Sequence, residues 1–182
     1  MEKPLLLLFL RFVMGYVFVF SLTGKLRNIP SFVQTITNFL FFPSKFSRPL
    51  AYIILIGEVS VVVAMLIGKN LLLWGFLITS LMFLAFSIAL SSVIVRNIKT
   101  SCNCFGPDEK EVNVGHVVRS LGFLVCGIGG MILTKLPFAT SSGVGIIEMF
   151  LIGVFAVVFV ILMMQISEVI KIFQLLLISD HR

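Results

Sequence analysis

Two cysteines stand one residue apart, and their spacing is the strongest sign of chemistry in the sequence. Cys102 and Cys104 lie in a polar interval, NIKTSCNCFGPDEKEVNVGHVVRS, that covers residues 97–120. Alternate Cα atoms of a bent chain fall within disulfide range, so the two thiols can bond to each other. The ring would be small and strained, and strain makes a disulfide easier to reduce. The spacing therefore predicts a reversible disulfide and not a structural crosslink.

Basic residues lie on both sides of this pair. Arg96 and Lys99 precede it, and Arg119 follows it near the start of the next predicted helix. Nearby positive charge lowers the pKa of a thiol and raises the fraction of reactive thiolate. Gly106-Pro107 predicts a turn directly after the pair, which would hold it in a fixed loop. These residues are the predicted thiolate-tuning groups.

Two other interpretations of the pair remain open. Together with His116, Cys102 and Cys104 could ligate Zn²⁺ or Cu⁺. No fourth ligand is visible in the sequence, and one histidine twelve residues away is a weak signal, so we predict no metal site. The cysteines could also be inert loop residues, although their place beside basic groups argues against this.

The elements that hold this loop must lie in a membrane. Of 182 residues, 59% are apolar and only 12% are charged, with a mean hydropathy of +1.14. A soluble globular chain is nearer a quarter charged. A chain as apolar as this one cannot bury all its apolar surface in a core of its own, so the bilayer must act as part of its solvent.

Five apolar runs are each long enough to cross ~30 Å of hydrocarbon. The fold class predicted is an all-α membrane protein: a four-helix transmembrane bundle with a fifth transmembrane helix packed outside it. One polytopic domain is expected over residues 1–182, with the cysteines in the loop 96–113. The predicted transmembrane helices cover 4–26, 49–68, 71–95, 114–134 and 146–170.

A short helix is predicted over 29–42, where apolar residues recur on one face between two membrane helices. It should lie on the membrane surface or pack over the bundle. In the fourth membrane helix, Gly122, Cys126 and Gly130 follow at spacing four, a small-residue pattern that allows close helix contact. This pattern favours a packing role for Cys126.

Four ionisable residues sit inside or at the edge of predicted membrane helices: Arg11, Lys25, Glu58 and Arg119. Each costs a few kcal/mol at mid-membrane unless it is paired or hydrated. One interpretation is a buried ion pair that only fixes helix packing. The other is a polar pocket beneath the cysteine loop, with Glu58 facing the bundle interior near a basic partner.

The net charge of +6 does not indicate a nucleic-acid partner, because the 14 Lys and Arg are scattered singly among short loops. In a membrane protein such residues mostly report topology and contact with headgroups. No cleavable signal peptide is expected, since the first apolar run continues far beyond the length of a signal core.

The whole chain resembles the MauE family, the methylamine-utilisation branch of the DoxX-like membrane proteins. The residues that carry the resemblance are RFVMGYVFVFSLTGKLRNIPSF near the start, Glu58, the CNCFG loop and Arg119. Residues 8–135 take part. The sequence departs from the family in one respect, because the usual Arg-Asn pair at the start of the fourth membrane helix reads Arg119-Ser120.

The resemblance implies a small DoxX-like bundle linked to thiol redox chemistry in the bacterial inner membrane. It implies support for maturation of a disulfide-rich exported protein, as in biogenesis of the methylamine dehydrogenase small subunit. A thioredoxin-like extracytoplasmic protein or a cysteine-containing client is the implied partner. A quinone is the one cofactor that the resemblance suggests.

Two classes of function follow. The first is a thiol–disulfide oxidoreductase or redox relay that uses Cys102 and Cys104. The second is a non-enzymatic membrane partner, such as an assembly, immunity or transport component, since a buried Glu facing Arg also suits a transporter. An open cavity next to the cysteines would favour the first.

The two arguments about orientation disagree. Ten basic residues fall on the side of the cysteine loop and three on the other, so the positive-inside rule would place the cysteines in the cytoplasm. The redox interpretation places them outside, where disulfides persist. On the strength of the resemblance we expect the loop to be extracytoplasmic.

Overall fold

Six α-helices make up the part of the chain that the computed structural model describes, which is residues 2–40, 44–68, 70–96, 114–136 and 145–180. No strand occurs among these residues. The helices are α1 (Glu2–Arg27), α2 (Ile29–Leu40), α3 (Ser44–Ile67), α4 (Leu71–Val95), α5 (Val114–Lys135) and α6 (Ile146–Asp180).

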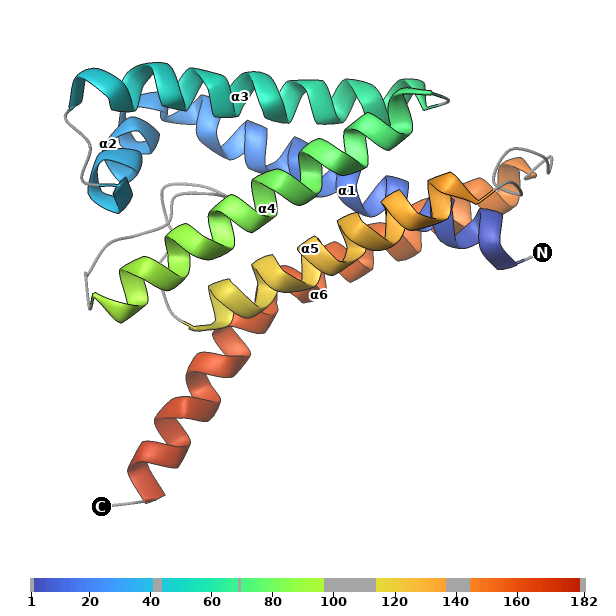
Figure 1. Cartoon of the computed structure of the whole chain (residues 1–182). Coiled ribbons are helices and arrows are strands. Elements are labelled where there is room, and N and C mark those ends of the chain that lie inside the picture. Colours follow the sequence, from blue (N-terminus) through green and yellow to red (C-terminus); the bar gives the residue numbers. More distant parts are fainter. Residues whose placement is uncertain (1, 41–43, 69, 97–113, 137–144, 181–182) are drawn as a thin grey trace.

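The long helices run back and forth along one another (Figure 1). α1, α3, α4 and α5 form the four-helix part, in which α4 packs most extensively on α5 and α3 lies against both α1 and α4. α6 packs against α1 and α5 from outside this group. The predicted fold class, an all-α membrane bundle with five spanning helices and one short helix, is confirmed.

Five of these helices are long and apolar enough to cross a membrane. In the apolar span of α1 only 39% of the most apolar stretch is buried inside the protein, and in that of α6 only 17%. The remaining apolar side chains point outward, which a water-soluble fold of this size would not tolerate. The protein is therefore a multi-pass membrane protein, and α6 is its most lipid-exposed helix.

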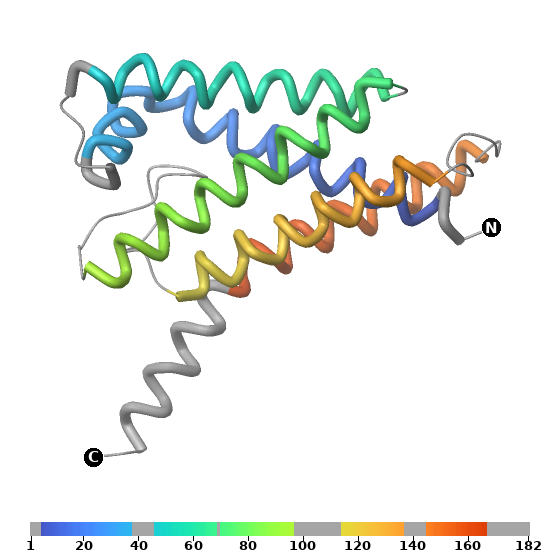
Figure 2. The backbone as a smooth tube through the Cα atoms, in the orientation of Figure 1, coloured from blue at the N-terminus to red at the C-terminus, as the bar shows by residue number. Residues whose placement is uncertain are grey.

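The short helix α2 closes one end of the bundle, where α1 ends and α3 begins (Figures 1 and 2). Its start is capped by Asn28, whose Oδ1 accepts a hydrogen bond from the Ser31 backbone N–H at 3.2 Å. Phe32 and Ile36 bury their side chains against Ala51 and Leu55 of α3. The predicted surface helix thus packs over the bundle.

Contact between α4 and α5 depends on glycines, but not on all those that the sequence pattern indicates. A Cβ added at Gly127 would lie 2.8 Å from Ser80 Oγ, and one at Gly130 would lie 2.2 Å from the Phe76 ring. Gly122, by contrast, faces Met163 of α6. The spacing-four pattern therefore serves two helix contacts, Gly130 against α4 and Gly122 against α6.

The third helix begins earlier than predicted, at Ser44 instead of residue 49. Pro49 lies inside the helix, five residues after Ser44, and not at its start. Because proline has no backbone N–H, α3 lacks the hydrogen bond from position 49 to the carbonyl four residues earlier, and the helix forms around this one missing bond. The longer helix changes the depth at which Glu58 lies.

Candidate functional site

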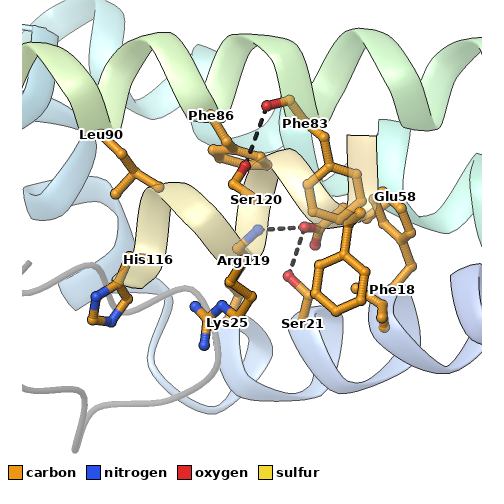
Figure 3. Close-up of a pocket in the computed structure, with 12 residues that line it drawn as sticks. Phe18, Ser21, Lys25, Glu58, Phe83, Phe86, Leu90, His116, Arg119 and Ser120 are labelled. Carbon is orange, nitrogen blue, oxygen red and sulfur yellow. Dashed lines mark hydrogen bonds and ion pairs between the residues drawn. The ribbon is translucent and has the colours of Figure 1, made fainter. Parts of the chain in front are cut away.

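A polar pocket lies between the four central helices (Figure 3). It is near the end of the bundle where α5 begins and where α2 packs, as the ribbon of Figure 1 places these helices. Apolar aromatic rings form most of its wall, and ionisable and hydroxyl side chains project into it. The polar lining comes from α1, α3 and α5, namely Ser21, Lys25, Glu58, His116, Arg119 and Ser120.

The centre of the pocket is an ion pair between Lys25 and Glu58. Both side chains are essentially inaccessible, with relative exposures of 1% for Lys25 and 0% for Glu58. Lys25 Nζ donates to Glu58 Oε1, and Ser21 Oγ donates to the same oxygen at 2.8 Å. Glu58 therefore faces the bundle interior beside a basic partner, as predicted.

Two aromatic rings complete the surroundings of Lys25. Its Nζ lies 4.8 Å from the ring centroid of Phe32 and 5.0 Å from that of Phe86. An ammonium over an aromatic face is attracted by the negative charge density of the ring. Because Phe32 belongs to α2, the short helix covers the ion pair as well as the end of α3.

Glu58 lies deep in the membrane-spanning part. It is fourteen residues from the first residue of α3 and nine from the last, which corresponds to about 21 Å and about 14 Å along the helix. A carboxylate at this depth is costly unless it is paired, so Lys25 is required next to it.

The first turns of α5 supply the remaining polar groups. His116 and Arg119 are buried, with 5% and 7% exposure, and they lie three residues apart on the same helix face. Ser87 Oγ donates to Ser120 Oγ at 2.9 Å, and Ser120 Oγ approaches the Phe83 carbonyl at 3.3 Å. Ser120 thus connects α5 to α4.

The pocket encloses a cavity of about 40 Å³. A cavity needs ~10–15 Å³ to hold one water, and one of ~150 Å³ holds benzene, so this space suits a few water molecules. Among the described residues no group donates to Glu58 Oε2, although that oxygen is buried. The arrangement can hold water against a buried carboxylate and present positive charge to an anion.

Arg11 does not belong to this pocket. Its Nε donates to the Met65 carbonyl, and its Nη2 donates to the Leu66 carbonyl at 2.7 Å. These carbonyls lie in the last turn of α3. Arg11 itself is fourteen residues from Lys25 along α1, or about 21 Å. The structure thus separates Arg11 from the other predicted pocket residues and makes it a cap for α3.

The predicted exchanging cysteines, Cys102 and Cys104, lie outside the described residues, as does Lys99. Arg96 is exposed and directly follows α4. Within the described ranges no three His, Cys, Asp or Glu side chains gather as metal ligands. The cysteine pair, its basic neighbours and the alternative metal site with His116 therefore stay predictions.

Several residues of the pocket were missed by sequence reasoning. Ser21 is one helical turn before Lys25 and shares its face, a signal that the spacing of four could have given. His116 was considered only as a metal ligand, yet it lines the pocket beside Arg119. Phe86 carries no sequence signal, since the chain has 19 phenylalanines and only packing places this one at the pocket.

Comparison with known proteins decides the family. The model of a family described as methylamine utilisation protein MauE matches residues 3–133, which is more than two thirds of the chain. This chain belongs to the MauE family. A relative named methylamine utilization protein MauE, from Paracoccus denitrificans, is 27% identical over 143 residues, covering 78% of this chain and 71% of the relative. No solved structure matches the chain.

The MauE match covers the helices that build the pocket. It begins in α1 and ends near the end of α5, so it includes every residue that lines the pocket. α6 lies outside it. The family assignment therefore applies to the four-helix part and its polar interior.

Proposed function

We propose that this MauE-family protein carries out thiol–disulfide exchange at the membrane surface, through Cys102 and Cys104. The observation that carries the proposal is the position of the pocket. α4 ends at Val95 and α5 begins at Val114, so the chain segment with both cysteines joins two helices that line the pocket. Both helix ends lie at the end of the bundle where α2 packs (Figure 1).

The proposed step is an exchange that balances without another oxidant. A thiolate of a partner protein's dithiol attacks one sulfur of the Cys102–Cys104 disulfide and forms a mixed disulfide. The second partner thiol then attacks that bond, so the partner leaves as a disulfide and the loop as a dithiol. Two electrons and two protons pass to the loop, and a second protein disulfide restores the pair by the same exchange.

The residues around the cysteine loop contribute positive charge. Arg119 is buried in the first turns of α5, and we propose that it stabilises the thiolate of the loop together with Arg96 and Lys99. Lys25 and Glu58 shape the pocket behind Arg119. A cation in a site shielded from water acts on a nearby thiolate more strongly than one at the surface.

The partner we propose is a thioredoxin-like extracytoplasmic protein or a cysteine-containing exported client. The membrane is the bacterial inner membrane, which suits the MauE family, and the loop faces the extracytoplasmic side. Disulfides persist on that side of the membrane and are kept reduced in the cytoplasm, which supports this placement.

Mass-tag alkylation of the protein in cells, with and without reductant, tests the proposal. Both loop thiols should react only after reduction, whereas in Cys102→Ser or Cys104→Ser the remaining thiol should react without reductant and maturation of an exported client should be lost. Cys126→Ser is the matched control, because Cys126 packs against the core within α5. Two thiols that are free in every condition would overturn the proposal and favour a non-enzymatic partner.

Orientation has a separate test. A cysteine introduced as Asp108→Cys, in a variant without the other cysteines, should react with a membrane-impermeant reagent in whole cells. Protection of that cysteine in intact cells, with labelling only after lysis, would place the loop in the cytoplasm and remove the extracytoplasmic client.

A further inference from the structure

A second, larger hollow lies on the lipid-facing side of the contact between α1 and α3. It is an apolar groove of about 350 Å³ whose lining includes Leu22 and Leu26 of α1 and Tyr52, Ile56 and Val59 of α3. Ile56 is 65% exposed and Tyr52 is 55% exposed, so the groove is open to the surroundings of the bundle. On the inner side of the same helix contact lies the Lys25–Glu58 pair.

The length of this groove limits what can fill it. On α3 it extends from Tyr52 to Ser60, eight residues or about 12 Å along the helix. The hydrocarbon core of a bilayer is ~30 Å thick, so the groove spans less than half of it. A partner's transmembrane helix would need a surface across the whole membrane, whereas a lipid acyl chain occupies a single leaflet.

Two exposed arginines lie close in sequence to residues that line the groove, at the end of α1 and near the start of α3. Arg48 is one helical turn before Tyr52 and therefore on the same face of α3, and Arg27 directly follows Leu26. Both lie within two residues of the end of an apolar span, at the level of the headgroups. A guanidinium pairs with phosphate through two parallel hydrogen bonds, and its charge attracts anionic lipid.

We infer that this groove is a binding site for an anionic phospholipid of the leaflet at the pocket end. The phosphate contacts Arg27 and Arg48, and one acyl chain lies along Leu22, Ile56 and Val59. The bound lipid covers the outer side of the α1–α3 contact that holds the ion pair on its inner side. This inference does not depend on the proposed redox function.

Quenching of a tryptophan by brominated lipids tests the site. The chain has one tryptophan, Trp74, so Trp74→Phe gives a silent background in which Ile56→Trp reports on the groove. The purified protein is reconstituted in phosphatidylcholine vesicles that contain brominated phosphatidylglycerol or brominated phosphatidylcholine at equal mole fraction. Ile88→Trp is the matched control, because Ile88 of α4 is 63% exposed, close to the 65% of Ile56.

Tryptophan at position 56 should be quenched more strongly by the brominated anionic lipid, and tryptophan at position 88 equally by both lipids. Adding Arg48→Gln or Arg27→Gln should lower the anionic preference at position 56 about fivefold each. Tyr52→Trp keeps an aromatic ring in the groove and serves as a second reporter with the same expected result.

If the preference for the brominated anionic lipid were no larger at position 56 than at position 88, the groove would have only ordinary lipid contact and the site would be overturned. A preference that survives both arginine substitutions would also overturn it. If neither brominated lipid quenches position 56 while both quench position 88, a protein segment fills the groove and the lipid assignment is wrong.

Discussion

Each end of the bundle uses a cation of α1 to contact α3, and the two contacts differ in kind. At one end, Arg11 donates to backbone carbonyls in the last turn of α3 and remains partly exposed. At the other, Lys25 is fully buried and pairs with the carboxylate of Glu58, beside a cavity. The first contact satisfies carbonyl groups that every helix leaves without partners. The second introduces a charge pair that the fold itself does not require.

This difference separates structure from function in the bundle. Arg11 interacts with the negative end of a helix, which is favourable wherever a cation can reach it. A buried ion pair is often no more stabilising than apolar residues of similar size. The pair at the pocket end is therefore better explained by the polar space it creates than by the stability it provides.

Glu58→Ala should have the largest effect on stability, because it leaves the Lys25 ammonium buried without its carboxylate. We expect a loss of about 3–5 kcal/mol in the free energy of unfolding, measured by denaturation in detergent micelles. The matched control replaces both partners, Lys25→Met with Glu58→Leu, and should recover most of that loss. If the double variant were as unstable as the single one, the pair would be structural and the comparison would fail.

The same double variant sharpens the comparison, because it separates stability from chemistry. If the pocket tunes the loop thiols, the double variant should fold and yet show altered alkylation of Cys102 and Cys104. An alkylation pattern identical to that of the unmodified protein would show that the ion pair has no part in the redox chemistry.

Arg11→Met should lower stability by about 1.5–3 kcal/mol, because two carbonyls at the end of α3 lose a charged donor. The redox state of the loop should not change, since Arg11 lies about 21 Å along α1 from Lys25. Lys135→Gln is the control, an exposed basic residue in the last turn of α5, and it should shift stability by less than ~0.5 kcal/mol. A change in thiol reactivity on Arg11→Met would contradict the division between the two ends.

Phe32→Leu should have the smallest effect, about 1–2 kcal/mol, because leucine keeps most of the apolar contact and loses the attraction to Lys25. Phe20→Leu on α1 is the control, since the Phe20 side chain is 44% exposed. Thermal unfolding in detergent compares the two variants. Equal midpoints would show that the ring of α2 contributes only apolar surface to the pocket.

The sequence by itself determined the class of the protein and its helices. Apolar runs with almost no charge can only be membrane helices, since backbone groups in lipid must be paired within the segment. The cost of a charge in hydrocarbon also determined that Glu58 needs a basic partner inside the bundle, and Lys25 was among those predicted. These inferences rest on local composition and on energies of several kcal/mol, so no packing detail was needed.

Only the tertiary structure decided which residues share the pocket and which do not. Arg11 and Lys25 look alike in the sequence, two cations on one apolar helix, but their partners depend on where α3 begins and ends. The same holds for Phe32, Phe86 and the choice of Gly127 over Gly122 as the close contact with α4. Such choices depend on how antiparallel helices align and rotate, and that alignment is set by many small packing contacts that no single stretch of sequence contains.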